Sequence, residues 1–258
     1  MTSTTDNAYW SNRKVISNQI SRIPDGRRLY AIGDIHGRSD LLQELHQKIL
    51  KDASDASNLL KHIVYLGDYI DRGPCSQQVI NLLLHDIPDG FTPTYLLGNH
   101  EAMLLDFLDT ASSGQNWLYN GGDATLMSYE IDEGILSQAI DYANLQSTLK
   151  NSLPAAHISF LNSLELSYDC GDYFFCHAGV KPSLSLDTQS KDDLLWIRDE
   201  FLYCSTQLEK IIVHGHSISD KVAFYPHRIG VDTGAWFSDQ LSALVLEGSE
   251  QRVISTGG

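Results

Sequence analysis

Side chains that bind metal ions occur at the ends of short apolar runs in this sequence. Asp34 and His36 close the run YAIGDIHGR, with one residue between them. A polar turn after a strand would also use glycine and aspartate, so this segment alone admits a purely structural interpretation. The alternative is that both side chains lie at the carboxyl end of a buried strand and face a metal ion. That hypothesis predicts further ligands at later strand ends.

Four later runs carry ligand-type side chains at the same kind of position. They are Asp68 and Asp71 in HIVYLGDYIDRGP, Asn99 and His100 in TPTYLLGNHE, His177 in YFFCHAG, and His214 and His216 in KIIVHGHS. Chance turns would not repeat carboxylate, amide and imidazole groups so uniformly. The set therefore favours a metal site over unrelated polar turns.

The elements between these motifs alternate over the first hundred residues. RRLYAI, HIVYLG and TPTYLL are typical of strands, while SDLLQELHQKIL, SQQVINLLLH and EAMLLDFLDT have the pattern of helices, with Ser39 as the expected N-cap of the first. A βαβαβα order predicts parallel strands joined by right-handed crossovers. Because ligands gather at the carboxyl ends of such strands, Asp34, Asp68 and Asn99 are expected at one edge of one sheet.

The later part of the chain predicts a second sheet. Residues 111–164 have a polar, helical pattern and are expected to form an insert. Turn-separated strand patterns follow, namely LELSYDC, DYFFC, EKIIVHG, VAFYPHRIGVDTG, LSALVLEG and QRVIST, and they suggest a second, mixed sheet. We expect an α/β protein with a four-layer α-β-β-α sandwich of two mixed sheets. One domain would span 26–258, after a polar, loosely ordered segment at 1–25.

Composition narrows the class of protein. The chain has 258 residues, 42% of them hydrophobic, and a formal net charge of −15. That charge argues against nucleic-acid or anionic-membrane partners, which need a basic face. No apolar stretch reaches the about 18 residues of a membrane span, and the start lacks the apolar core of a secretory signal, so a cytoplasmic protein is expected. The four cysteines form no Cys-x-x-Cys pair and are expected to be free thiols.

The ligand types indicate a pair of divalent ions. Carboxylate, imidazole and amide groups suit manganese, iron or zinc better than calcium, and manganese is the expected ion. Two ions about 3.5–4 Å apart need a bridging carboxylate and can activate a shared water. Asp68, on the middle strand, is the natural bridge. The expected remaining ligands are Asp34 and His36 for one ion, and Asn99, His177 and His216 for the other.

A phosphate dianion would complement such a site only with additional positive charge. Arg72 follows Asp71 directly, and Arg198 lies in LLWIRDEF; a guanidinium group matches phosphate oxygens in a bidentate geometry. His100 follows Asn99 and cannot easily reach the same ion, so we expect it to donate a proton to the leaving group. Asp71 would orient it. Two interpretations of His214 remain: it supports the metal ligands, or it is part of the core.

The motifs GDIHG, GDYIDRG, GNHE, HAG and HGHS, in this order, resemble those of the PPP family of metal-dependent serine/threonine protein phosphatases within the calcineurin-like phosphoesterases. WIR and VDTGA extend the likeness to the bacterial branch typified by bacteriophage lambda phosphatase, over about Arg28 to Leu246. The resemblance implies the fold and the site roles given above. It also selects His216 over His214, because GHS fits the family's Gly-His-Thr-like pattern.

The resemblance implies a phosphomonoesterase for phosphoserine and phosphothreonine, in which a metal-activated hydroxide attacks phosphorus directly. Similar bacterial enzymes hydrolyse dinucleoside polyphosphates with the same core, and Trp117 with Tyr119 would then stack on adenine unless they only pack the insert. Asn120, in NWLYNGGDATL, is a candidate substrate contact beside two glycines. A non-catalytic phosphate-binding scaffold is the remaining alternative, and the complete ligand set argues against it.

Overall fold

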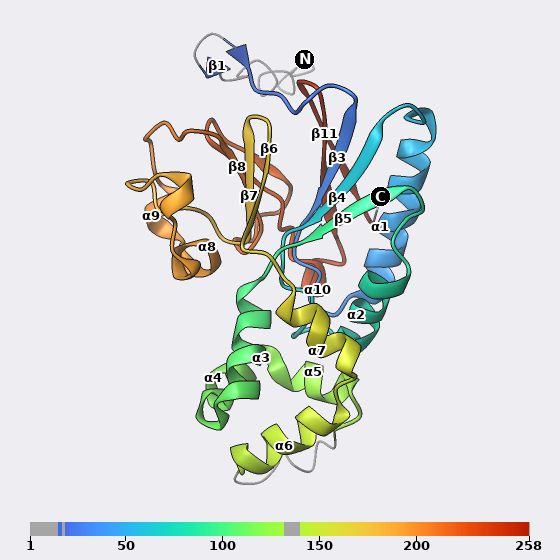
Figure 1. Ribbon diagram of the computed structural model, residues 1–258, viewed down its shortest axis with the longest axis vertical. Coiled ribbons are helices and arrows are strands. Elements are labelled where there is room, and N and C mark those ends of the chain that lie inside the picture. Colours follow the sequence, from blue (N-terminus) through green and yellow to red (C-terminus); the bar gives the residue numbers. More distant parts are fainter. Residues whose placement is uncertain (1–14, 17–18, 132–139, 258) are drawn as a thin grey trace, which may run out of the picture.

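The structure is a computed structural model that describes residues 15–16, 19–131 and 140–257. The segment expected to be loosely ordered, 1–25, therefore lies largely outside the described residues. Two five-stranded sheets face each other, and helices cover the outer face of each (Figure 1). The predicted α/β sandwich of two mixed sheets is confirmed.

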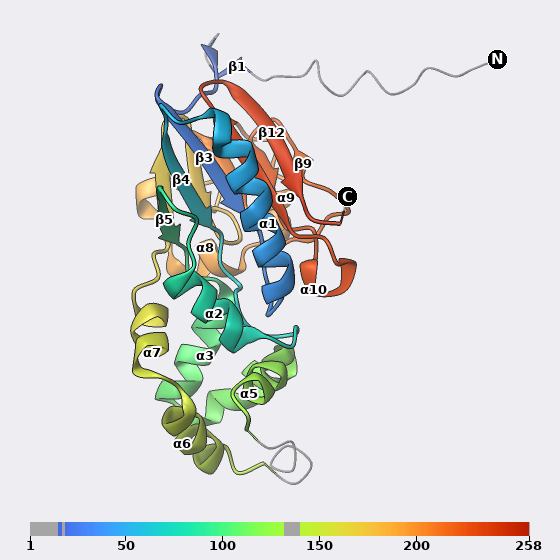
Figure 2. The same cartoon turned by 90° about the vertical axis from the view of Figure 1, so that its right-hand side faces the viewer.

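The first sheet contains the three predicted parallel strands. Its order is β12 (Glu250–Ser255), β11 (Ser242–Glu247), β3 (Arg27–Ile32), β4 (Leu60–Tyr65) and β5 (Phe91–Tyr95). Strands β3, β4 and β5 are parallel, whereas β11 is antiparallel to both of its neighbours. The crossover helices are α1 (Ser39–Asp52) and α2 (Ser76–His85), which cover the outer face (Figure 2).

Two expectations for these elements are wrong. Ser39 is the first residue of α1 rather than its N-cap; Arg38 holds the N-cap position and makes no side-chain capping bond. The runs LSALVLEG and QRVIST form β11 and β12 of the first sheet, not part of the second. Alternating apolar residues identify a strand, but they do not identify the strand with which it pairs. Strand β11 pairs with β3, although most of the sequence separates the two strands.

The second sheet has the order β6 (Ser167–Cys170), β7 (Tyr173–Cys176), β8 (Ile211–His214), β10 (Arg228–Gly230) and β9 (Ala223–Phe224). Its central pairs are parallel and its edge pairs antiparallel. Helices α8 (Lys191–Trp196) and α9 (Asp199–Leu202) lie on its outer side (Figure 1). Both β7 and β8 therefore lie between neighbours and end at the same edge of the sandwich.

The alternation of side chains along each strand builds the layers of the core. In β3, Leu29 and Ala31 pack between the two sheets, whereas Tyr30 and Ile32 pack toward α1 and the helical segment. In β7, Phe175 faces the first sheet and Phe174 faces α8 and α9. The apolar residues on both sides of a strand explain why these runs look continuously hydrophobic in the sequence.

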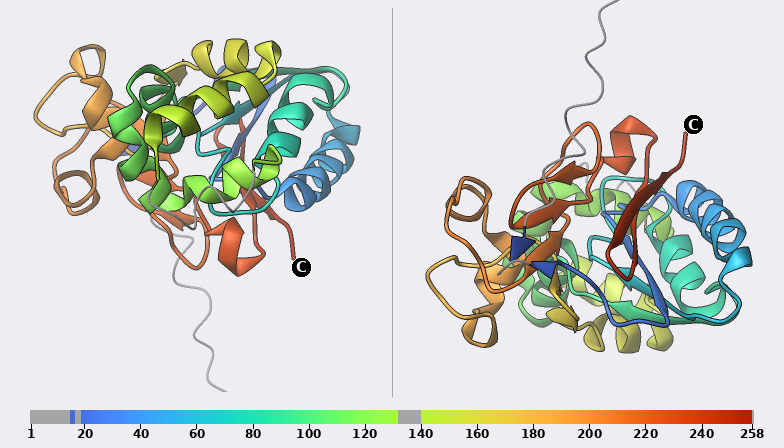
Figure 3. Two further views of the ribbon diagram at one scale, coloured as in Figure 1. Left: turned by 90° about the horizontal axis from the view of Figure 1, so that it is seen from below. Right: turned by 90° about the horizontal axis from the view of Figure 1, so that it is seen from above.

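Helices lie across the carboxyl ends of the strands, as the view from below shows (Figure 3). After α3 (Asn99–Asp109), the described part of the expected insert contains α4 (Gly114–Trp117), a π-helical turn at Leu118–Gly122, α5 (Asp123–Ser128), α6 (Tyr142–Ser152) and α7 (Ala155–Asn162). The short helix α10 (Ala235–Ser238) lies at the same end of the sandwich (Figure 1).

The smaller elements do not change this architecture. They are the strands β1 (Val15–Ile16) and β2 (Gln19–Ile20) and the 3₁₀ turns at Ala53–Asp55, Ala111–Ser113 and Leu186–Thr188. All four cysteines are free thiols, as expected. Among the described residues, no helix combines the length and apolarity needed to cross a membrane.

Candidate metal centre

The loops that follow the strands hold an unusual concentration of left-handed backbone. Seven described residues other than glycine have a positive φ, and five of them belong to the predicted site: His36, Asp68, Asp71, Arg72 and His216. Such conformations cost about 1–3 kcal/mol each and persist only where the surroundings hold them in place. Five unfavourable backbone conformations thus occur at one edge of the sandwich. They lower the stability of the fold and orient these side chains toward the predicted site.

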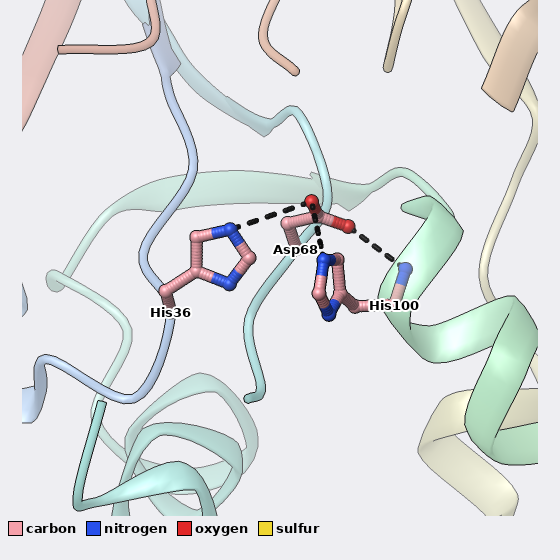
Figure 4. Close-up of side chains that lie close together, drawn as sticks. All are labelled: His36, Asp68 and His100. Atoms are coloured by element: carbon pink, nitrogen blue, oxygen red, sulfur yellow. Dashed lines mark hydrogen bonds and ion pairs between the residues drawn. The ribbon is translucent and has the colours of Figure 1, made fainter. Parts of the chain in front are cut away.

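Three buried side chains converge in the first group of candidate ligands. His36 and His100 point toward the carboxylate of Asp68 from two directions (Figure 4), with Nε2 to Oδ2 distances of 3.5 and 3.9 Å. His36 Nδ1 donates to the carbonyl of Ile70 at 2.8 Å. Its Nε2 therefore presents a lone pair to a carboxylate that also carries lone pairs, an arrangement that a cation would stabilise.

The second group shares Asp68 and adds ligands from both sheets. His177 Nε2 lies 2.8 Å from Asn99 Oδ1, 3.2 Å from His216 Nδ1 and 3.5 Å from Asp68 Oδ1. His177 Nδ1 donates to the carbonyl of Leu66 at 2.8 Å, so its Nε2 also carries a lone pair. Lone pairs from four residues thus converge on one point, which fits a divalent cation with mixed nitrogen and oxygen ligands.

Asp68 belongs to both groups, as a bridging ligand must. Burial alone would raise the pKa of its carboxyl group, but the surrounding His177, His100 and His36 hold that pKa far below the usual range. Burial lowers the pKa of His36 to about 3, so this imidazole is neutral and able to bind a cation. A buried carboxylate beside a neutral imidazole is the electrostatic pattern of a cation site.

Asp34 lies at the border of this centre and outside both groups. Its two carboxylate oxygens accept hydrogen bonds from the backbone N–H of His216 at 3.0 and 3.1 Å. Burial, together with the negative charges of Asp232 and Asp68, raises the pKa of Asp34 well above its usual value. Asp232, in the VDTGA motif, is a buried acid that sequence reasoning missed; burial raises its pKa to about 6.

His100 and Asp71 form the predicted pair. Their Nδ1 and Oδ2 atoms lie 2.7 Å apart, and both side chains are fully buried. Burial by itself would lower the pKa of His100, but the charge of Asp68 and the hydrogen bond to Asp71 outweigh that effect and raise it. Among the described residues, His100 Nε2 has no hydrogen-bond partner. Its Nε2 therefore faces Asp68, on the side away from Asp71.

The insert supports Asp71 in a way that the sequence did not reveal. Trp117 Nε1 donates to Asp71 Oδ2 at 2.9 Å, and Thr125 Oγ1 donates to Oδ1 at 2.6 Å. Trp117 is fully buried, so the suggestion that it stacks on adenine is wrong. Tyr119, the other suggested ring, is 89% exposed.

Glu101 is a second residue that sequence reasoning missed. Its carboxylate accepts four backbone N–H groups, from Gly98, Asp68, Tyr69 and Ile70, at 2.7 to 3.2 Å. It thereby ties the loop that carries Asp68 to the start of α3. The signal was present, because a glutamate three residues after Gly98 is the acid position of a capping box.

The two predicted arginines differ in how they are held. Arg72 is partly buried, donates from Nη1 to His36 Nε2 at 2.9 Å, and is fixed through its backbone N–H by the carbonyl of Gly121. Arg198 is exposed at the start of α9. Burial is the main cause of the lowered pKa values of His177 and His216, and the positive charge of Arg198 contributes to lowering them. Arg72 thus comes from the loop after β4 of the first sheet, and Arg198 from the start of α9, beside the second sheet.

Two further residues have defined contacts. Asn120 donates from its side chain to the carbonyl of Asn116 at 2.8 Å, one residue before the glycine that holds Arg72. His214 is buried, donates to the carbonyl of Gly215 at 2.9 Å, and receives a bond from Arg228 at 3.3 Å. It supports the loop that carries His216, which agrees with the supporting role suggested for it.

Residues 27–242 match the calcineurin-like phosphoesterase family, a range that includes every ligand described above. The chain belongs to the calcineurin-like phosphoesterases. It is therefore a metallophosphoesterase, a class that works with divalent metal ions, and the two donor groups around Asp68 fit such ions.

Curated relatives of this metallophosphoesterase have two kinds of name. The chain is 30% identical to "Serine/threonine-protein phosphatase 2" of Escherichia coli (strain K12), over 84% of this chain and 91% of that protein. It is 25% identical to the asymmetrical bis(5'-nucleosyl)-tetraphosphatase PrpE of Bacillus mycoides (strain KBAB4), over 83% of this chain and 88% of the relative. The family is thus shared, while the substrates named for these relatives differ.

Solved structures share the fold of this phosphoesterase. A putative diadenosine tetraphosphatase superposes with a TM-score of 0.60 at 21% identity, covering 90% of this chain and 96% of the other. A cold-active protein-tyrosine phosphatase of a psychrophilic Shewanella species superposes with a TM-score of 0.61 at 21% identity, covering 90% and 80%. These likenesses establish the common sandwich.

Proposed function

We propose that this metallophosphoesterase is a serine/threonine protein phosphatase that hydrolyses phosphomonoesters by direct attack of a hydroxide on phosphorus. The observation that carries the proposal is the buried pair of His100 and Asp71, 2.7 Å apart, whose free Nε2 lies beside Asp68. The 30% identical relative named as a serine/threonine phosphatase supports the same conclusion.

The chemistry of the leaving group favours a monoester. Departure of a serine or threonine side chain produces a strongly basic alkoxide, which needs a proton as the ester bond breaks. The leaving group of a dinucleoside polyphosphate is a phosphate anion, which is stable without one. A protonated His100, held by Asp71 and with a raised pKa, is equipped for the first reaction and is dispensable for the second.

The other predicted residues would complete this site. The expected ligands of the two ions are Asp34, His36, Asp68, Asn99, His177 and His216. A pair of divalent cations, when bound, supplies hydroxide at neutral pH and offsets the charge of the phosphate. Arg72 and Arg198 would hold phosphate oxygens, and Asn120 would contact the substrate beside them. We propose manganese as the resident ion, with iron or zinc as alternatives.

Hydrolysis of dinucleoside polyphosphates is a second candidate, favoured by the relatives named bis(5'-nucleosyl)-tetraphosphatase. The exposed ring of Tyr119, in the insert that also carries Trp117, is the available surface for a nucleobase. The third candidate, a non-catalytic phosphate-binding scaffold, does not require a buried proton donor beside ligands with strained backbone. We therefore do not favour the scaffold.

Parallel assays separate the candidates. Phosphoserine peptides, p-nitrophenyl phosphate and diadenosine tetraphosphate are compared as substrates with added manganese. The proposal expects the highest kcat/KM for the peptides, loss of activity with a chelator, and recovery with manganese. A clear preference for diadenosine tetraphosphate would overturn the phosphatase assignment. Full activity of protein shown by elemental analysis to be metal-free would overturn the role of the ions.

A further inference from the structure

Three apolar side chains form an exposed surface beside the candidate centre. Trp236 and Phe237 belong to α10, and Ile218 follows β8; they are 40%, 56% and 46% exposed. The two rings meet with centroids 5.1 Å apart. Ile218 and Phe237 both lie over Gly234, where a Cβ atom would clash with them. We call Trp236, Phe237 and Ile218 the α10 platform.

The α10 platform is tied to the loop that supplies a predicted ligand. Arg38, two residues after His36, donates to the carbonyl of Ala235 at 2.9 Å and to Asp239 Oδ1 at 2.6 Å, two residues that flank Trp236 and Phe237 in the sequence. The backbone N–H of Gly234 donates to Asp232 at 2.8 Å. Single exposed apolar residues are normal on protein surfaces. A cluster of three apolar side chains in a segment that is hydrogen-bonded to the loop of a predicted ligand indicates a binding surface instead.

The position of the α10 platform relates it to the phosphate. The Trp236 ring centre lies 5.9 Å from Cζ of Arg72, and Arg72 Nη1 lies 2.9 Å from His36 Nε2. A chain of contacts thus links the candidate metal centre to the platform, from His36 through Arg72 to Trp236, whose ring contacts that of Phe237. A group bound to Arg72 would have an apolar wall directly beside it.

The spacing suits a polypeptide. In an extended peptide, residues two apart point to the same side and are separated by about 6.6 Å, so a side chain two positions from the phosphorylated residue can reach an apolar ring that adjoins Arg72, as the Trp236 ring does. We propose that the α10 platform binds an apolar side chain two positions from the phosphorylated residue of a peptide substrate. This inference rests on the proposed phosphoprotein phosphatase function and names the feature of the substrate that the enzyme selects.

The shape of the α10 platform favours a side chain over a nucleobase. A base needs a flat ring face on which to stack, whereas the Trp236 and Phe237 rings are inclined by 73° and form a corner. Ile218 adds aliphatic surface beyond that corner. Asp220 lies near its edge, while Asp239 there is paired with Arg38, so an acidic side chain at this substrate position would lie close to the carboxylate of Asp220.

The test compares matched phosphoserine peptides that carry leucine, glycine or glutamate two positions from the phosphoserine. Glycerol phosphate, which lacks an apolar group, is the reference substrate. The wild-type enzyme is expected to prefer leucine to glycine by about tenfold in kcat/KM, the effect of one apolar group in a pocket. Phe237→Ala and Trp236→Ala should lower that ratio toward one, and Trp236→Phe should restore part of it. Leu60→Ala, at an exposed position at the amino end of β4, is the control and should keep the wild-type ratio.

Each other outcome overturns the proposal in a distinguishable way. If the peptides are hydrolysed with equal kcat/KM, the α10 platform does not select them, although the phosphatase function stands. If Trp236→Ala slows glycerol phosphate as much as the leucine peptide, Trp236 only orients Arg72. If no peptide is hydrolysed while diadenosine tetraphosphate is, the phosphatase function itself fails, and the α10 platform with it.

Discussion

At the scale of single residues, the site depends on Asp68 more than on any other side chain. Asp68 is shared by both groups of candidate ligands, has a left-handed backbone, and receives the backbone N–H of His100 at 3.0 Å. Motif spacing predicted its central place, because Asp68 follows the middle strand. Spacing indicates the capping-box position of Glu101, but the hydrogen bonds that it accepts from the loop of Asp68 become visible only in the folded chain.

Asp68→Asn should therefore damage both ion sites together, since one carboxylate oxygen serves each group. We expect loss of both ions and a fall in activity beyond the 10–100-fold that altering a supporting residue typically costs. Asp34→Asn is the matched variant and should weaken mainly one ion, because Asp34 is predicted to bind only the ion that His36 binds. Metal content after dialysis, measured by elemental analysis, tests this; equal losses in both variants would contradict a bridging role.

His100→Asn should lower kcat while leaving the metal content nearly unchanged. General-acid catalysis contributes about 10²–10⁴-fold, and the loss should be largest for an alkyl phosphate, whose leaving group needs the proton. For p-nitrophenyl phosphate, with a stable leaving group, the loss should be much smaller. Because His100 Nε2 lies 3.9 Å from Asp68, the metal measurement is essential: a variant that loses an ion has lost a ligand, not an acid.

At the scale of elements, the insert supports the carboxylate of Asp71 in a way that its sequence pattern concealed. The helices α4 and α5 were predicted only as a polar, helical segment, yet they deliver Trp117 and Thr125 to the carboxylate of Asp71. The strands β3, β4 and β5 were predictable because their pairing follows the order of the chain. The pairing of β11 with β3 was not, since it depends on residues about 210 positions apart.

Trp117→Phe tests the link from insert to acid. The substitution keeps the apolar packing against Phe107 but removes the donor to Asp71. We expect kcat to fall about tenfold for alkyl phosphates, less than the about 10²–10⁴-fold of the whole general-acid contribution, because Asp71 keeps its other partners, with little change for p-nitrophenyl phosphate. Thr125→Val should act in the same direction. Circular dichroism checks folding, and a uniform loss on both substrates would indicate a packing defect instead.

At the scale of the whole molecule, stability should depend on pH through a histidine outside the site. His46 in α1 is 4% exposed and bonds to the hydroxyl of Tyr65, and burial lowers its pKa to about 4. The unfolded chain binds a proton there below about pH 6.5, while the folded chain does not. Stability is therefore present above pH 6.5 and is lost as the pH falls toward 4, by up to about 3 kcal/mol.

The measurement is urea unfolding of wild-type protein and His46→Gln between pH 4.5 and 7.5, both with a chelator. Because glutamine does not titrate, the stability of the wild type relative to the variant should decrease as the pH falls. A difference that stays constant over this range would show that His46 is not the titrating group.

The pairing of β11 with β3 also sets the order of events during synthesis. Strand β3 emerges first, but its neighbour β11 is made about 210 residues later, which takes roughly 10–40 s at translation rates of about 5–20 residues per second. Leu244 and Leu246 of β11 belong to the core between the sheets. Until β11 arrives, one edge of β3 stays unpaired and the core between the two sheets lacks Leu244 and Leu246. The nascent chain is thus exposed to aggregation for most of its synthesis, and a chaperone that shields open sheet edges should raise the yield of folded enzyme.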